Sequence, residues 1–154
     1  MDSAKALGRR LLPVLLLLAA GAAAPPAPPP PSFAALVERA RRGIVEVSPA
    51  ELKARLASPR PPLLVDVRED SEWAQGRLPG AVHMSRGTLE RRLEAAAPDA
   101  ETEVVLYCAS GARSALAAES LGRMGYRRVS SLAGGYKAWT RAGFPVVKEA
   151  PGGG

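Results

Sequence analysis

Cys108 is the residue of this sequence best suited to covalent chemistry. It follows the apolar run Val104–Tyr107 and precedes a stretch of small residues that ends in Arg113. An apolar run of this length predicts a buried strand, whereas the residues from Ser114 to Met124 have the periodicity of a helix. We therefore expect Cys108 to lie on a loop between the end of a strand and the start of a helix.

The loop itself is suited to holding a negatively charged sulfur. Its residues after the cysteine are Ala109, Ser110, Gly111, Ala112 and Arg113. Small side chains allow successive backbone amides to converge on the sulfur, and Gly111 can adopt a positive φ at low cost. The N-terminus of a helix also favours anions. We expect the loop to favour the thiolate of Cys108, which is the reactive form of a cysteine.

The remaining sulfur and imidazole groups restrict what such a thiolate could do. Cys108 is the only cysteine, so the chain has no second thiol to resolve a disulfide. The only histidine, His83, lies outside the loop. We expect His83 to be a hydrogen-bonded residue on or near a strand rather than the partner of Cys108 in a Cys–His pair.

Charged residues follow a second apolar run, at the point where another strand is predicted to end. Asp66 and Arg68 stand there, and Glu72 lies in a short predicted helix over residues 69–74. Charges in this position commonly orient loops around a site. We expect Asp66, Arg68 and Glu72 to brace the loop. Arg113 has two alternatives: it binds an anionic substrate, or it pairs with Glu72 or Asp66.

The elements that must position these residues alternate between strand and helix. Strands are predicted at 44–47, 63–65, 81–83, 104–107 and 129–132, of which 63–65 and 104–107 are continuous apolar runs. Helices are predicted over 33–41, 69–74, 88–97, 114–124 and 136–142, with one more that Ser48 caps. This alternation is typical of the α/β class, in which helices cover both faces of a mostly parallel sheet, here of five strands.

Four blocks of the sequence together resemble the single-domain rhodaneses. They are Val65–Arg68, Glu72–Trp73 with Gly76–Ala81, Cys108–Ser114 and Leu132–Trp139, in the family's order. The resemblance covers the chain from about Ile44 to Val147. It implies the rhodanese-like three-layer fold, a central and mostly parallel five-stranded sheet flanked by helices, with Cys108 in the active-site loop.

The resemblance also implies sulfur transfer in two steps, without a metal or an organic cofactor. The Cys108 thiolate attacks the outer sulfur of a small anionic donor such as thiosulfate, and the persulfide then passes this sulfur to cyanide or a thiol. An exported protein is a further candidate acceptor. Two residues depart from the family pattern. Arg77 stands where a histidine is frequent, and Ala109 stands where many members that use thiosulfate have a cationic residue.

Two other functions stay open from the sequence. One is a non-catalytic rhodanese fold that binds another exported protein or carries a persulfide for it. The other is a phosphatase-like enzyme that processes oxyanions on the same fold. Phosphatases of this fold have one residue more in the loop than the four between Cys108 and Arg113. The shorter loop forms a tighter ring, which favours sulfur over phosphate.

The first 24 residues have the features of a secretory signal peptide. Lys5, Arg9 and Arg10 form a positive start, and the residues 11–24 that follow carry no polar side chain. The predicted divisions of the chain are a signal peptide at 1–24, a proline-rich linker at 25–32, the rhodanese-like domain at 33–149 and a flexible tail at 150–154. We expect export to a bacterial periplasm or the cell exterior, with an uncleaved membrane anchor as the alternative.

The composition fits a soluble enzyme domain. Hydrophobic residues make up 47% and charged residues 23% of the sequence, which is the balance of a globular chain. The formal charge of +6 falls to +4 without the signal peptide, which carries Lys5, Arg9 and Arg10 against Asp2. The arginines are spread over separate segments without interleaved aromatic residues. We therefore expect no nucleic-acid partner.

Overall fold

The computed structural model describes residues 28–148. The predicted signal peptide, the start of the linker and the C-terminal tail lie outside the described residues. Within the described part, residues 28–32 precede the first helix and have no regular secondary structure. None of the helices between residues 28 and 148 is long and apolar enough to cross a membrane.

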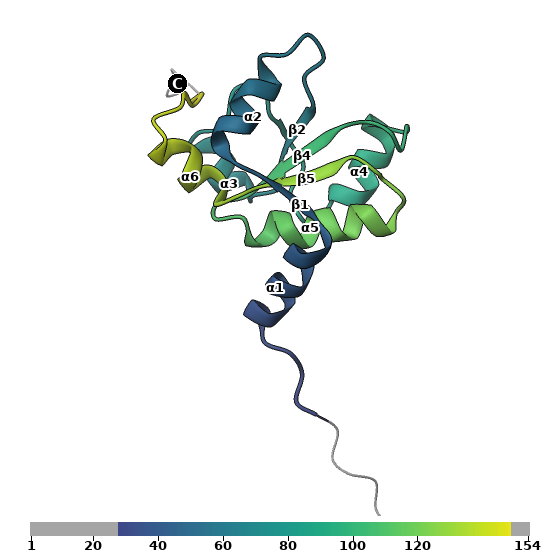
Figure 1. Ribbon diagram of the computed structural model, residues 1–154. Helices are drawn as coiled ribbons and strands as arrows, with labels where there is room; N and C mark the ends of the chain where they lie inside the picture. The colour runs from purple at the N-terminus through teal and green to yellow at the C-terminus, as the bar shows by residue number, and fades with distance from the viewer. Residues whose placement is uncertain (1–27, 149–154) are drawn as a thin grey trace, which may run out of the picture. The chain divides into compact units, whose positions relative to one another are not determined.

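Helices and strands alternate along the described chain (Figure 1). In order they are α1 (Phe33–Gly43), β1 (Val45–Val47), α2 (Pro49–Leu56), β2 (Leu63–Asp66), α3 (Asp70–Ala74), β3 (Val82–His83), α4 (Leu89–Ala96), β4 (Val104–Tyr107), α5 (Ala112–Arg123), β5 (Val129–Leu132) and α6 (Gly135–Arg141). The expected α/β class is confirmed. Its five strands form one sheet in the order β1-β5-β4-β2-β3.

All pairings within this sheet are parallel, where the sequence predicted a mostly parallel one. In the pairing of β4 with β2, Leu106 lies opposite Val65, and in its pairing with β5 it lies opposite Ser131. All four residues of β4 are buried. Because the carboxyl ends of parallel strands meet at one edge, Cys108 leaves the sheet beside the ends of β2 and β5.

The sheet separates two hydrophobic cores, one for each face. Successive side chains of a strand point to opposite faces, so Leu106 and Val105 of β4 enter different cores. The first core packs Leu106 against α4 and α5, and the second packs Val105 against α2 and α6. Figure 1 shows α2 on one side of the sheet and α4 and α5 on the other. Burial of these side chains is the main force that fixes the strand ends.

Several element boundaries differ from the predicted ones, and one difference bears on the site. Helix α5 begins at Ala112, two residues before the predicted start at Ser114. Gly111 has a φ of 94° and stands at the N-cap, so the chain turns into the helix directly after it. Ala112 and Arg113 therefore lie in the first turn of α5, not in the loop.

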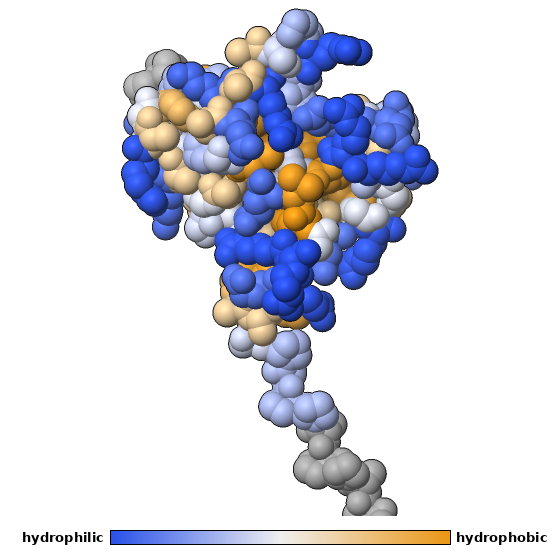
Figure 2. All heavy atoms as spheres, viewed as in Figure 1, coloured by the Kyte–Doolittle hydropathy of each residue, from blue (hydrophilic) through white to orange (hydrophobic). Residues whose placement is uncertain are grey.

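Strand β1 forms one edge of the sheet, and its first residues are exposed. Val45 is 59% exposed on this strand. Figure 2 shows apolar surface at this edge between charged residues. Arg55, Arg127 and Arg128 surround a shallow hollow here with Val45 and Val129. These arginines pair with Glu101 or Glu103.

Candidate active site

Cys108 follows the carboxyl end of β4, which is the central strand of the sheet. The sequence predicted this position at the end of a strand. Its side chain is almost fully buried, with 1% of the residue exposed. The backbone N–H of Gly111 donates to Sγ over 3.1 Å. This contact places the sulfur directly over the N-terminus of α5. A thiolate there is stabilised by the amide and by the dipole of the helix.

The N-terminus of α6 holds the backbone of the Cys108 loop from behind. The amide of Tyr136 donates to the carbonyl of Cys108 over 2.8 Å, and the amide of Lys137 donates to the carbonyl of Ala109 over 3.1 Å. Gly135 makes this approach possible. A side chain at Gly135 would overlap the Cys108 carbonyl, and its φ of 57° also favours glycine. The sequence indicated only a turn here and did not predict this support.

Of the two carboxylates that the sequence offered as partners of Arg113, the structure pairs it with Glu72. Its two terminal nitrogens donate to the two oxygens of Glu72 over 2.7 and 2.8 Å. Glu69 lies 3.7 Å from the same guanidinium. These hydrogen bonds lower the pKa of Glu72 to about 2 and raise the pKa of Arg113. The pair joins the first turn of α5 to α3, so it braces the loop.

Asp66 and Arg68 form a separate buried pair behind the site. The guanidinium of Arg68 donates to both oxygens of Asp66, at distances between 2.6 and 3.0 Å, and to the carbonyl of Gly76 over 2.7 Å. It also lies 4.3 Å from the centre of the Tyr136 ring. Asp66 therefore does not pair with Arg113. Both residues tie the end of β2 to the turn at Gly76.

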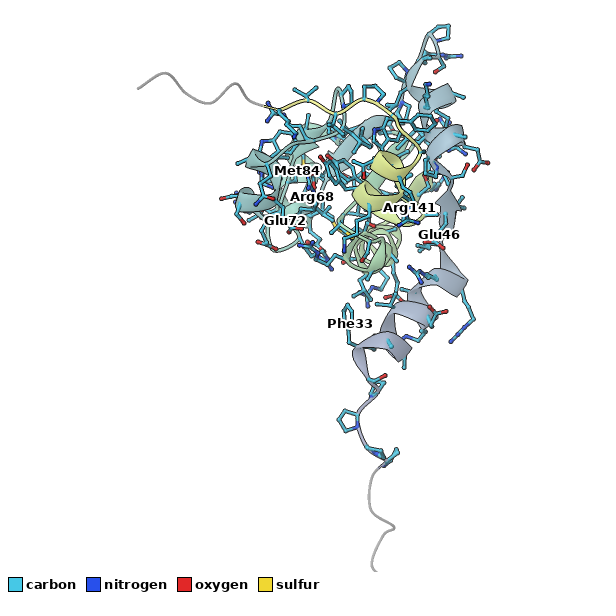
Figure 3. The ribbon with its side chains drawn as sticks, turned by 90° about the vertical axis from the view of Figure 1, so that its left-hand side faces the viewer. Phe33, Glu46, Arg68, Glu72, Met84 and Arg141 are labelled. Atoms are coloured by element: carbon cyan, nitrogen blue, oxygen red, sulfur yellow. The ribbon has the colours of Figure 1, made fainter. Side chains whose placement is uncertain are left out.

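Figure 3 shows Arg68, Glu72 and Met84 in one region of the domain. They come from the segments after β2, within α3 and after β3, and these segments surround the carboxyl edge of the sheet. Met84 is 5% exposed and belongs to the same core cluster as Cys108. Met84 therefore packs in the hydrophobic core that also holds the side chain of Cys108.

His83 has partners other than Cys108, as the sequence analysis expected. Its Nε2 lies 2.9 Å from the carbonyl oxygen of Arg68, and its Nδ1 lies 3.6 Å from a carboxylate oxygen of Asp70. The imidazole also stacks on Trp73, with 5.0 Å between the ring centres. These contacts hold the histidine at the end of β3. They give no support to a Cys–His pair.

Two buried serines beside Cys108 were not singled out in the sequence. The hydroxyl of Ser114 donates toward Sγ over 3.6 Å, and the hydroxyl of Ser131 donates to that of Ser114 over 2.8 Å. Both serines are 0% exposed. A serine within a predicted helix and another within a predicted strand give no sign in the sequence of such a meeting, because only the packing of α5 on β5 brings them together.

Comparison with protein families gives a match over most of the domain. The model of the rhodanese-like domain matches residues 48–142. A sulfurtransferase from Allochromatium vinosum is 42% identical over 102 residues, which is 66% of this chain and 94% of that protein. The family match includes the Cys108 loop, α3 and α6, and it begins after α1 and β1.

Solved structures share the fold. The polysulfide-sulfur transferase homodimer of Wolinella succinogenes has a TM-score of 0.67 and 31% identity, over 79% of this chain and 91% of that one. A protein of unknown function from Rhodopseudomonas palustris, described as a possible tyrosine phosphatase, has a TM-score of 0.68 and 30% identity, over 80% of this chain and all of that one.

Proposed function

The chain belongs to the rhodanese-like family, and we propose that it transfers sulfur through a persulfide on Cys108. Its sulfurtransferase relatives support sulfur transfer in general. The observation that carries the finer proposal is the position of Sγ, 3.1 Å from the Gly111 amide at the start of α5. A buried sulfur with fixed donors is suited to a charged, covalent intermediate.

The first half of the proposed reaction loads the enzyme. The Cys108 thiolate attacks the outer sulfur of a donor such as thiosulfate, and a new S–S bond forms at Sγ. The bond between the two donor sulfurs breaks, and sulfite leaves with the electron pair. The negative charge of the enzyme is then on the outer sulfur of the persulfide. The Gly111 amide, which donates to Sγ at the N-terminus of α5, supports the proposal that backbone donors of the loop stabilise this charge.

The second half discharges the enzyme. A nucleophilic acceptor, cyanide or a thiolate, attacks the outer sulfur of the persulfide. The bond between this sulfur and Sγ breaks, and Sγ keeps the electron pair as a thiolate. Thiocyanate or a new persulfide leaves, and Cys108 returns to its starting form. None of these steps requires a metal or an organic cofactor.

The ion pair between Arg113 and Glu72 favours sulfur transfer over phosphate hydrolysis at this loop. A phosphatase needs a cation that faces the phosphate, but both terminal nitrogens of Arg113 are bound by Glu72. The four residues between Cys108 and Arg113 carry no charge. A single sulfur atom needs fewer donors than a phosphate does, so it fits this loop better.

The test of the proposal is a mass measurement on the intact protein. After incubation with thiosulfate, we expect the wild type to gain the mass of one sulfur atom and to lose it when cyanide is added. Cys108→Ala is the control and should gain nothing. An equal gain on Cys108→Ala would overturn the mechanism. A persulfide that passes only to a particular protein would instead indicate a carrier.

We also propose export, on the basis of the signal-peptide features of residues 1–24. Expression of the full chain in a bacterium, followed by sequencing of the N-terminus, tests this. A mature protein in the periplasmic fraction that starts close after residue 22 is expected. A cytoplasmic protein that retains its first residues would refute export.

A further inference from the structure

Ser114 and Ser131 form a chain of hydroxyl groups that ends at the sulfur of Cys108. Ser131 lies on β5 and Ser114 in the first turns of α5. The hydroxyl of Ser131 donates to Oγ of Ser114 over 2.8 Å, and that of Ser114 donates toward Sγ over 3.6 Å. Both side chains are fully buried between the helix and the sheet. Neither hydroxyl is therefore in contact with bulk solvent.

The direction of these hydrogen bonds limits what the Ser114 proton can do. Because Ser131 donates to Ser114, one lone pair of Ser114 is occupied. The single proton of Ser114 has two acceptors within reach, Sγ of Cys108 and the carbonyl oxygen of Gly111 at 3.2 Å. A hydroxyl group can rotate between two such acceptors. It donates to the one that carries more negative charge, since charge-assisted hydrogen bonds are the stronger ones.

We propose that Ser114 and Ser131 stabilise Sγ whenever it is a thiolate, and that they thereby assist the release of sulfur from the enzyme. The inference rests on the proposed function, because it concerns the discharge of a Cys108 persulfide. Ser114 is then a catalytic residue that touches the reacting sulfur. Ser131 is a positioning residue, which acts by fixing the orientation of Ser114.

The cycle of charge on the two sulfurs gives the hydroxyl chain its role. In the loaded enzyme the charge lies on the outer sulfur, Sγ is neutral, and the Ser114 proton bonds to the Gly111 carbonyl. When an acceptor takes the outer sulfur, the electron pair of the broken S–S bond moves to Sγ. The Ser114 proton then turns to Sγ, because its charge makes it the better acceptor. The Ser114 hydroxyl thus stabilises only the Sγ thiolate that leaves during discharge. The backbone amides of the loop stabilise the charge of the persulfide as well.

A purely structural role would explain the buried hydroxyl of Ser114, but it would not explain why the hydroxyl of Ser131 donates to it. A serine near the start of a helix commonly bonds to a carbonyl one turn back, as Ser114 does with Gly111. The buried hydroxyl of Ser131, however, donates to the side chain of Ser114 rather than to a backbone carbonyl. Its neighbour Ser130 is also buried but points to the other face of the sheet, since side chains alternate along a strand. Ser130 therefore provides a matched control on the same strand.

The experiment compares Ser114→Ala, Ser131→Ala and Ser130→Ala in two measurements. The first is the rate of alkylation of Cys108 as a function of pH. Loss of one hydrogen bond to a charged group corresponds to roughly a tenfold effect. We expect Ser114→Ala to be alkylated about tenfold more slowly near neutral pH and to recover the wild-type rate at higher pH. Ser131→Ala should show a smaller shift in the same direction, and Ser130→Ala none.

The second measurement is the rate at which preloaded enzyme passes its sulfur to cyanide in a single turnover. We expect Ser114→Ala to discharge roughly tenfold more slowly than Ser130→Ala. Ser114→Thr, which keeps a hydroxyl group, should restore most of the rate. Equal discharge rates and equal alkylation profiles in Ser114→Ala and Ser130→Ala would overturn the inference.

The two proposals fail in different ways. If the wild type gains no sulfur from thiosulfate or from an organic persulfide, the proposed function is wrong, whatever the alkylation profiles show. If the wild type loads and discharges but Ser114→Ala does so at the same rate, only the role of the hydroxyl chain is wrong. Circular dichroism of each variant separates both results from a loss of folding.

Discussion

Arg113 donates two parallel hydrogen bonds to Glu72, which lies 41 residues earlier in the sequence. Side-chain exposure is 31% for Arg113 and 30% for Glu72, so the pair is half-buried at the rim of the site. A bidentate pair of this kind has little freedom to rearrange. It fixes the first turn of α5 against α3 and thereby helps to fix the Gly111 amide that donates to Cys108.

Glu72→Gln should therefore destabilise the protein by about 1–2 kcal/mol, because a charged bidentate pair is replaced by a weaker neutral contact at a partly exposed site. Thermal or urea unfolding measures this loss. Glu119→Gln on α5 is a control of equal size and charge change, and it should leave the free energy of unfolding nearly unchanged. Equal losses in the two variants would contradict the bracing role of Glu72.

The same pair predicts a pH dependence of stability. The pKa of Glu72 falls from an ordinary value of 4.5 to about 2 in the folded protein, because Arg113 donates to it. A lowered pKa means that the stabilisation is fully present above about pH 5 and is lost as the pH falls toward 2. The difference in unfolding free energy between wild type and Glu72→Gln should shrink over this range. A difference that stays constant from pH 6 to pH 2.5 would refute the assignment.

Gly135→Ala should disrupt the loop from behind. A methyl group there would overlap the Cys108 carbonyl and lie 3.0 Å from the Gly111 nitrogen, and the residue has a positive φ. Overlap with backbone and an unfavourable φ together cost about 3 kcal/mol or more. The free energy of unfolding and the rate of persulfide formation should both fall. Gly87→Ala is the control, since nothing lies within 4 Å of its added methyl group. A stable, active Gly135→Ala would show that the loop tolerates displacement.

The sequence was sufficient for the sheet and for the position of Cys108. Each strand is a short segment between helical or turn segments, and β4 and β5 were predicted with the bounds that the structure has. Helix α5 starts two residues earlier than predicted. The reason is that Gly111 itself turns the chain, whereas the apolar periodicity used for the prediction begins only after Arg113.

The partners within the site were less predictable, because they depend on packing. The sequence offered Glu72 and Asp66 equally as partners of Arg113. Arg113 pairs with Glu72 because α3 lies beside α5. Asp66 instead pairs with Arg68, two residues further along the chain. The support from Gly135 and the hydroxyl chain from Ser131 follow from the meeting of β5, α5 and α6. A local sequence pattern contains no information on such meetings.

Asp66→Asn should be among the most damaging changes outside the loop. It removes the charge that balances the Arg68 guanidinium, which is 4% exposed. A buried charge without its counterion costs about 3–5 kcal/mol. Urea unfolding of Asp66→Asn, Arg68→Met and the double variant forms a cycle that measures the coupling. The double variant should be clearly more stable than the sum of the two single losses predicts, and strict additivity would contradict the pairing.

Ala109→Lys should improve the use of thiosulfate. No residue between Cys108 and Arg113 carries a charge, and Arg113 is held by Glu72, so a doubly charged donor meets no cation in the loop. A lysine at this partly exposed position would attract the donor by about 1 kcal/mol, or roughly fivefold in kcat/KM. Ala109→Gln has a similar size without the charge and should show no gain. The advantage of the lysine should fall as salt is added, because salt screens exposed charges. A gain that Ala109→Gln shares, or one that is insensitive to salt, would show that charge is not what limits the donor.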